Sequence, residues 1–145
     1  MTPGYDEIYL DSSMNILGQA FDWVANTCED SLDRFVDRFV SAPVAALFAS
    51  GCPKYVAGVN GAELVNETMK SLDLPEYPQE HEFWLDKSPE YWIGWMLAYL
   101  QWREKVSFRH LLEHVPLDRI RQTYHLGHEQ DVEHIAGLLL KESET

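Results

Sequence analysis

The most constraining feature of this sequence is a stretch of aromatic and aliphatic residues at 88–102, SPEYWIGWMLAYLQW. Ser88 is a favourable N-cap and Pro89 suits the first helical position, so the stretch predicts a helix over about residues 89–104. A helix that is apolar on nearly all sides belongs in the interior of a protein. It is too short to cross a bilayer, which takes about 20 apolar residues. We therefore predict a central core helix, with the rest of the chain packed around it.

Helical periodicity also dominates the flanking sequence, and no convincing pair of strands is present. The other predicted helices cover about residues 12–28, 31–40, 43–50, 60–72, 107–115, 116–124 and 129–141. Residues 52–60, which contain Pro and Gly, are predicted to be a connection. We expect an all-α fold, a single compact bundle of six to eight helices around the Trp/Tyr-rich helix. It would form one domain over residues 1–145, with residues 1–10 and 142–145 as candidate flexible ends.

The charge of the chain is strongly negative and unevenly distributed. The formal net charge is −13, from 11 Lys and Arg against 24 Asp and Glu. Residues 1–86 carry 4 basic and 15 acidic residues, whereas residues 87–145 carry 7 and 9. An acidic surface repels nucleic acids and anionic membranes and attracts basic partners. The charge therefore disfavours nucleic acid and membranes as partners, although solubility alone is a simpler explanation of it.

Cysteine usage indicates the compartment. The chain has two cysteines, Cys28 and Cys52, and its first residues lack the basic and apolar regions of an export signal. Both features are typical of a reducing environment, so we expect a cytoplasmic protein. A chain of this length can bury a core without disulfides or metals, and we expect no cofactor.

Residues 73–88 form the most acidic connection in the chain, with two prolines, five acids and three aromatic residues. This is long for a structureless connection in a compact domain. We predict that its aromatic side chains pack on the core while its acids face solvent. Four of these acids are the candidate partner-binding residues: Glu76, Glu80, Glu82 and Asp86.

Residues 110–114, His-Leu-Leu-Glu-His, match the H-x-x-E-H pattern of inverted zinc peptidases. His110 and His114 would share one helix face and Glu113 could act as a general base. Such a short pattern arises easily by chance, and several histidines close together are more often surface and cap residues. We expect no metal site here. If the chain does hold a metal, His110 and His114 are the predicted ligands.

Residues 107–124 predict two short helices joined at Val115-Pro116, an arrangement that resembles a helix-turn-helix motif. Arg119 and Arg121 could then face a DNA groove. DNA-binding proteins usually carry a broad basic surface, which this chain lacks. An ordinary helical hairpin is the simpler interpretation.

The aromatic residues of the central helix allow a binding role as well as a packing role. A cage for a cation or a base could be formed by Trp92, Trp95, Tyr99 and Trp102, together with Trp84. Aromatic residues at helical spacing are more often part of the core, which is the interpretation we favour. Gly94, one turn before a small alanine, would let a neighbouring helix approach closely.

Three stretches extend the interpretation beyond single motifs: PKYVAGVNGAEL at 53–64, SPEYWIGWMLAYLQW at 88–102, and the span from Ser107-Phe108 to Val115-Pro116. Together they resemble a family of small all-α bacterial proteins, whose most specific feature is the pattern S-P-E-Y-W-x-G-W-x-L-A-Y-x-Q-W. Genes of this family often lie near toxin–antitoxin or mobile-element loci. The resemblance covers most of the chain and implies an accessory protein without an assigned reaction.

The leading functional hypothesis is a non-enzymatic protein-binding module. It would neutralise or regulate a protein partner, as an antitoxin or a mobile-element inhibitor of a host defence system does. The acidic surface would steer the chain onto a basic cleft, exposed apolar residues would hold the contact, and nucleic-acid mimicry is one version of this mechanism. The alternatives are a metal-dependent hydrolase using His110, Glu113 and His114, and a helix-turn-helix DNA-binding regulator using residues 107–124.

Overall fold

The computed structural model describes residues 5–77 and 88–143, and this part of the chain is all-α, as predicted. A 3₁₀ turn (Glu7–Tyr9) precedes the first helix and a π-helical turn (Trp23–Thr27) follows it. The helices in the described part of the chain are α1 (Leu10–Asp22), α2 (Leu32–Ser41), α3 (Pro43–Ala49), α4 (Pro53–Ala57), α5 (Gly61–Ser71), α6 (Pro89–Glu104), α7 (Phe108–His114), α8 (Leu117–Gly127) and α9 (Val132–Ser143).

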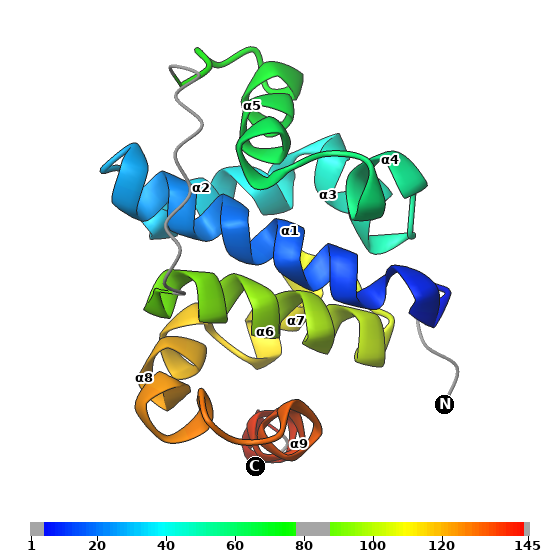
Figure 1. The fold of residues 1–145 in the computed structure, drawn as a ribbon, viewed down its shortest axis with the longest axis vertical. Coiled ribbons are helices and arrows are strands. Elements are labelled where there is room, and N and C mark those ends of the chain that lie inside the picture. The colour runs from blue at the N-terminus through cyan, green and yellow to red at the C-terminus, as the bar shows by residue number, and fades with distance from the viewer. Residues whose placement is uncertain (1–4, 78–87, 144–145) are drawn as a thin grey trace.

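Helices α1 and α6 form an antiparallel pair through the middle of the molecule (Figure 1). Two polar contacts join their opposite ends. At one end the Ser88 hydroxyl donates to a carboxylate oxygen of Asp22 at 2.5 Å. At the other end the Trp102 indole N–H donates to the carbonyl oxygen of Tyr5 at 2.8 Å. Helices α2 to α5 lie on the α1 side of this pair, and α8 and α9 lie on the α6 side (Figure 1).

The boundaries of α6 follow the local chemistry that the sequence predicts. The Ser88 side chain accepts a hydrogen bond from the backbone N–H of Tyr91 at 3.1 Å, and Pro89 occupies the first turn. The helix ends at Lys105, whose φ of 57° is left-handed. A helix that continued past this residue would need right-handed backbone angles there, so Lys105 terminates α6.

Glycines allow α1 and α6 to approach closely. A Cβ placed on Gly94 would lie 2.8 Å from the carbonyl carbon of Leu17 and 3.0 Å from the Cα of Gly18. A Cβ on Gly18 would lie 2.9 Å from the carbonyl oxygen of Tyr91. The distances of 2.8 Å and 2.9 Å are shorter than real Cβ contacts, so no larger residue fits at either position without movement of the backbone. The predicted close approach at Gly94 is confirmed, and α1 is the helix that approaches.

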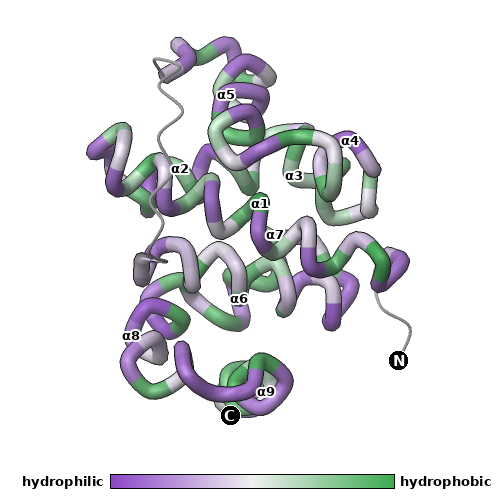
Figure 2. The backbone as a smooth tube through the Cα atoms, in the orientation of Figure 1, coloured by the Kyte–Doolittle hydropathy of each residue, from purple (hydrophilic) through white to green (hydrophobic). Residues whose placement is uncertain are grey.

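Every helix in the described part of the chain contributes buried side chains to the core. In α6 the buried residues fall on all sides of the helix. Much of α6 nevertheless appears pale rather than green in Figure 2, because Trp and Tyr have intermediate hydropathy. Trp92, Tyr99 and Trp102 are buried, in agreement with the predicted core helix. Trp95 is only partly buried at the edge of the core, so its prediction as a full core residue is wrong.

The described residues contain nine α-helices, more than the six to eight expected. The additional helix is α4, in the segment predicted to be a connection. Pro53 suits the first turn of a helix, where its missing N–H costs nothing, and Tyr55 and Val56 are then buried. A proline in a short segment is therefore compatible with a helix as well as with a loop.

The start of the chain also differs from the prediction. Helix α1 begins at Leu10 rather than at about residue 12, because Asp6 caps a preceding 3₁₀ turn by accepting from the N–H of Ile8. Residues 5–10, expected to be part of a flexible end, are held in place. The Tyr5 and Ser13 hydroxyls share a hydrogen bond of 2.6 Å, and the Tyr5 carbonyl binds Trp102.

Two other predicted helix starts are confirmed. Asn60 and Glu63 form a capping box at α5, and Ser107 caps α7 by accepting from the N–H of His110. None of the helices in the described part of the chain combines the length and apolar composition that a membrane crossing requires.

Candidate functional site

A hollow beside α5 is lined mainly by acidic side chains. The hollow is open, has a volume of about 240 Å³, and is lined by Glu63, Asn66, Glu67, Lys70 and Glu76. Glu76 is therefore the one candidate partner-binding residue that the structure locates. The other three candidates, Glu80, Glu82 and Asp86, lie outside the described residues.

The segment that carries Glu76 is fixed by hydrogen bonds of Tyr77. The Asn66 side chain accepts from the backbone N–H of Tyr77 at 2.9 Å and donates to its carbonyl oxygen at 3.3 Å. The Tyr77 hydroxyl donates to a carboxylate oxygen of Asp30 at 2.5 Å. This bond is the main cause of the lowered pKa of Asp30, whereas burial, followed by the Asp30 bond, raises the pKa of Tyr77 to about 12. Glu76 therefore stands on an anchored segment.

The histidine pair lies on α7 and is exposed. The rings of His110 and His114 lie edge to face with their centroids 4.4 Å apart, as expected for positions i and i+4 of a helix. Glu113 is exposed on the same helix. Within the described residues no three His, Cys, Asp or Glu side chains come together in a way that could hold a metal ion. Among the described residues, His110 and His114 therefore have no third side chain beside them that could complete a metal site.

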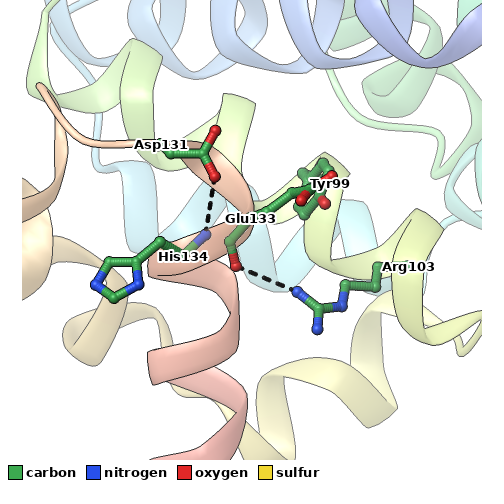
Figure 3. A pocket seen from close by; sticks show the side chains of 5 residues that line it. All are labelled: Tyr99, Arg103, Asp131, Glu133 and His134. Carbon is green, nitrogen blue, oxygen red and sulfur yellow. Dashed lines mark hydrogen bonds between the residues drawn. The ribbon is translucent and has the colours of Figure 1, made fainter.

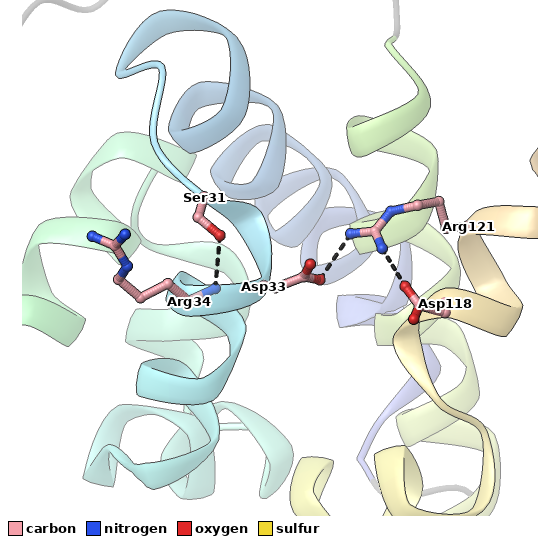
Figure 4. A network of polar contacts seen from close by, with 5 residues as sticks. All are labelled: Ser31, Asp33, Arg34, Asp118 and Arg121. Atoms are coloured by element: carbon pink, nitrogen blue, oxygen red, sulfur yellow. Dashed lines mark hydrogen bonds and ion pairs between the residues drawn. The ribbon is translucent and has the colours of Figure 1, made fainter.

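Two arginines of α7 and α8, Arg109 and Arg121, contact α2. The Arg121 guanidinium lies between Asp118 on its own helix and Asp33 on α2, with an N–O distance of 2.8 Å to Asp33 (Figure 4). Hydrogen bonding to Asp33 raises the pKa of Arg121. Arg109 donates to the Ser41 hydroxyl at 2.9 Å. Arg119 is half-buried, and its Nη1 has no hydrogen-bond partner among the described residues. In this arrangement Arg109 and Arg121 hold the helix pair against α2.

A second open hollow, of about 570 Å³, lies between α6 and the start of α9. The residues around it are Tyr99, Arg103, Asp131, Glu133 and His134 (Figure 3). Arg103 donates to the backbone carbonyl oxygen of Glu133 at 3.4 Å. The His134 ring points away from the Arg103 guanidinium (Figure 3). The imidazole of His134 and the guanidinium of Arg103 therefore do not face each other across the hollow.

The aromatic residues of α6 divide into two groups. Tyr99 and Trp102 contact each other toward the carboxyl end of the helix, where Trp102 binds the backbone of Tyr5. Toward the amino end of the helix, Trp92 and Trp95 line a pocket with residues of α8. The four aromatic residues of α6 therefore do not line one common cage, which was the alternative to a packing role, and Trp84 lies outside the described residues.

Tyr91, Trp92 and Trp95 instead line a partly enclosed pocket of about 170 Å³ together with Tyr124 and His128. The last two residues come from the end of α8, which was predicted to stop at about Tyr124. The helix continues to Gly127 and makes His128 its C-cap, one turn after Tyr124. The 3.6-residue period could have shown that Tyr124 and His128 share a face, but no sequence signal placed that face against α6.

Comparison of the chain with models of known families, with curated proteins and with solved structures finds no match. The resemblance described from the sequence therefore stays a prediction.

Proposed function

We propose that this protein is a non-enzymatic protein-binding module whose acidic amino-terminal region docks onto a basic surface of a protein partner. The observation that carries the proposal is the excess of acid over base in residues 1–86, 15 against 4. In the described part of this region Arg34 pairs with Asp30 and Lys54 pairs with Glu67. So few bases leave most of the carboxylates available to an external cation.

The hollow beside α5 provides a place where a basic side chain could bind. Its wall carries the carboxylates of Glu63, Glu67 and Glu76, and one cation, Lys70. Glu63 and Glu76 make no ion pair with any residue that the structure describes. An arginine or lysine of a partner would find charge-assisted hydrogen-bond acceptors there.

The mechanism that fits this surface is occlusion of a basic site on the partner. Long-range attraction between opposite charges raises the association rate and weakens as salt increases, whereas buried apolar contacts determine the dissociation rate. A module of this kind would act as an antitoxin or as an inhibitor of a defence system, and imitation of a nucleic acid is one form it could take. Among the residues that the structure describes, the large apolar side chains that are exposed lie on four different elements: Ile8, Leu47, Leu126 and Leu138.

The test compares two charge reversals of equal size. The first variant changes the candidate partner-binding acids to lysine: Glu76, Glu80, Glu82 and Asp86. The control variant changes four acids of the carboxy-terminal region to lysine: Glu104, Glu113, Glu129 and Glu133. A partner is first captured from the native host with the wild-type chain and identified by mass spectrometry, and its binding kinetics are then measured at several salt concentrations.

We expect the first variant to associate at least about tenfold more slowly at low salt, with a weaker salt dependence and a similar dissociation rate. The control variant should keep most of the wild-type association rate. Circular dichroism would establish that both variants remain folded. Equal association rates for the wild type and the first variant would refute this docking surface and leave solubility as the role of these acids.

A further inference from the structure

The aromatic pocket between α6 and α8 has a shape and a size that suit a small group. Three of its rings come from the first turns of α6 and two from the end of α8. Its volume is about 170 Å³. A water molecule in the liquid occupies about 30 Å³, so the pocket has room for a group of about five or six non-hydrogen atoms. This is the size of a methylated ammonium group with its attached carbons.

The walls of the pocket are held in place by their own contacts. The Tyr124 ring meets Trp92 at 72° with centroids 5.8 Å apart, and stacks on His128 at 16° with centroids 4.4 Å apart. His128 is fixed in turn, because its Nδ1 donates to the carbonyl oxygen of Tyr124 at 2.7 Å. The Tyr91 hydroxyl donates to the Asn15 side chain of α1. Binding therefore requires little ordering of these side chains.

A glycine keeps α8 close to the ring of Trp92. A Cβ placed on Gly127 would lie 3.2 Å from Cζ2 of Trp92 and 3.2 Å from Cγ2 of Ile135. Both distances are tighter than most real Cβ contacts. The buried side of Trp92 is thus supported by α8 and α9, while Trp95 stays partly exposed at the edge of the core.

The electrostatic environment of the pocket favours a cation. The faces of aromatic rings carry negative potential and attract cations within about 6 Å of the ring centre. Two lining residues of the pocket have an acidic neighbour in the sequence: Glu90 precedes Tyr91, and Glu129 follows His128. A carboxylate oxygen of Glu129 lies 3.9 Å from Nε2 of His128. Arg121, one turn before Tyr124 on α8, is already paired with two carboxylates. The chain as a whole is also strongly acidic.

We propose that this pocket binds an organic cation, a methylated ammonium group, between the rings of Trp92, Trp95 and Tyr124. A weakly hydrated methylated ammonium loses little by leaving water and gains the attraction of the ring faces. Two sources share this chemistry, a free choline-like molecule and a trimethylated lysine side chain of a protein. The inference does not depend on the acidic surface beside α5.

The first experiment compares choline with its uncharged isostere 3,3-dimethylbutan-1-ol, by NMR of the tryptophan indole groups in the full chain. Choline should shift the indole signals of Trp92 and Trp95 in a saturable manner and leave Trp102, at the other end of α6, unchanged. The neutral isostere should bind about tenfold more weakly. Equal binding of the two compounds, or no saturable shift with choline, would overturn the proposal.

The second experiment uses variants that remove a ring from the pocket. Trp95→Leu and, separately, Tyr124→Leu should each weaken choline binding at least about tenfold. The matched control is Tyr9→Leu, which removes a half-buried ring from the 3₁₀ turn at the start of the chain. Circular dichroism melts would verify that each variant is folded. Unchanged choline binding in both pocket variants would overturn the proposal even if the wild type binds choline.

A third measurement distinguishes the two sources of the cation. A short peptide with a trimethyl-lysine and the same peptide with an unmodified lysine are titrated alongside free choline. Tighter binding of the methylated peptide than of choline assigns the pocket to a modified protein partner, and the reverse order assigns it to a small molecule. Tighter binding of the unmodified peptide than of the methylated one would overturn the proposed preference for methylated cations.

Discussion

Replacing Gly94 with alanine provides a sharp test of how α6 packs on α1. In an isolated helix this substitution is stabilising by about 1 kcal/mol, because alanine has the higher helix propensity. In this protein the new Cβ would lie 2.8 Å from the carbonyl carbon of Leu17 and 3.0 Å from the Cα of Gly18. Backbone atoms cannot rotate away. The two helices would have to separate by more than half an ångström to restore an ordinary contact of 3.4 Å.

The expected cost follows from these opposing effects. Overpacking of a core costs about 1–3 kcal/mol, and a clash with the backbone of the central helix pair belongs near the upper end of that range. After the gain in helix propensity is subtracted, Gly94→Ala should reduce the free energy of unfolding by about 2 kcal/mol. For a protein of this size each kcal/mol corresponds to about 2–4 °C, so the melting temperature should fall by about 4–8 °C.

The control is the same substitution in a different helix. Gly137 lies in α9, and a Cβ placed there has no neighbouring atom within 4 Å. Gly137→Ala should therefore stabilise the protein by about 0.5–1 kcal/mol. Urea denaturation and thermal melting, both followed by circular dichroism, would measure the two changes. If Gly94→Ala melted at or above the wild-type temperature, the close approach of α1 and α6 would not exist as described.

Two other predictions concern the tryptophans of α6 and the contact between Asp30 and Tyr77. Trp92→Ala should lower the free energy of unfolding by about 3–5 kcal/mol in urea denaturation. Trp95→Ala should lower it clearly less, because Trp92 is buried and Trp95 is only partly buried. Equal losses of stability in the two variants would contradict this difference in burial. The lowered pKa of Asp30 contributes stability above its unfolded value of about 3.8, and this contribution is lost as the pH falls through the lower folded value. Tyr77→Phe removes the main cause of that shift, so urea denaturation over a range of acidic pH should show a smaller loss of stability than in the wild type, and an identical pH dependence would refute the assignment.

The parts of the fold that could be predicted are those determined by local chemistry. The start of α6 at Ser88 and Pro89 depends on a cap and on the φ angle of proline, and both are visible in the sequence. The capping box of Asn60 and Glu63 is equally local. Helix α4 was missed because Pro53 is compatible with a turn and with the first turn of a helix, and burial of Tyr55 decides between them. That burial depends on other helices.

The candidate sites could be predicted less well, because they depend on which helices are neighbours. Gly94 indicated a close approach, but nothing in the sequence identified α1 as the approaching helix. Arg121 was a candidate for contacting DNA, whereas the structure places it against Asp33, which is 88 residues away in the sequence. Trp95 followed the spacing of a core residue, yet it lies where α6 meets the end of α8 and is partly exposed. Periodicity shows which face a residue shares, but not what covers that face.

The central position of α6 links the stability of the fold to the proposed cation pocket. The Tyr91 carbonyl oxygen lies against Gly18 of α1, and the Tyr91 side chain contributes a ring to the pocket. Gly94, one turn further along, determines how closely the same segment of α6 approaches α1. A change that separates the two helices would therefore also move Tyr91 relative to Tyr124 on α8. The acidic hollow beside α5 is built from α5 and the residues after it, on the opposite side of α1, so it does not share this dependence. The two proposed sites are thus structurally separable, and a variant of one can be used as a folded control for the other.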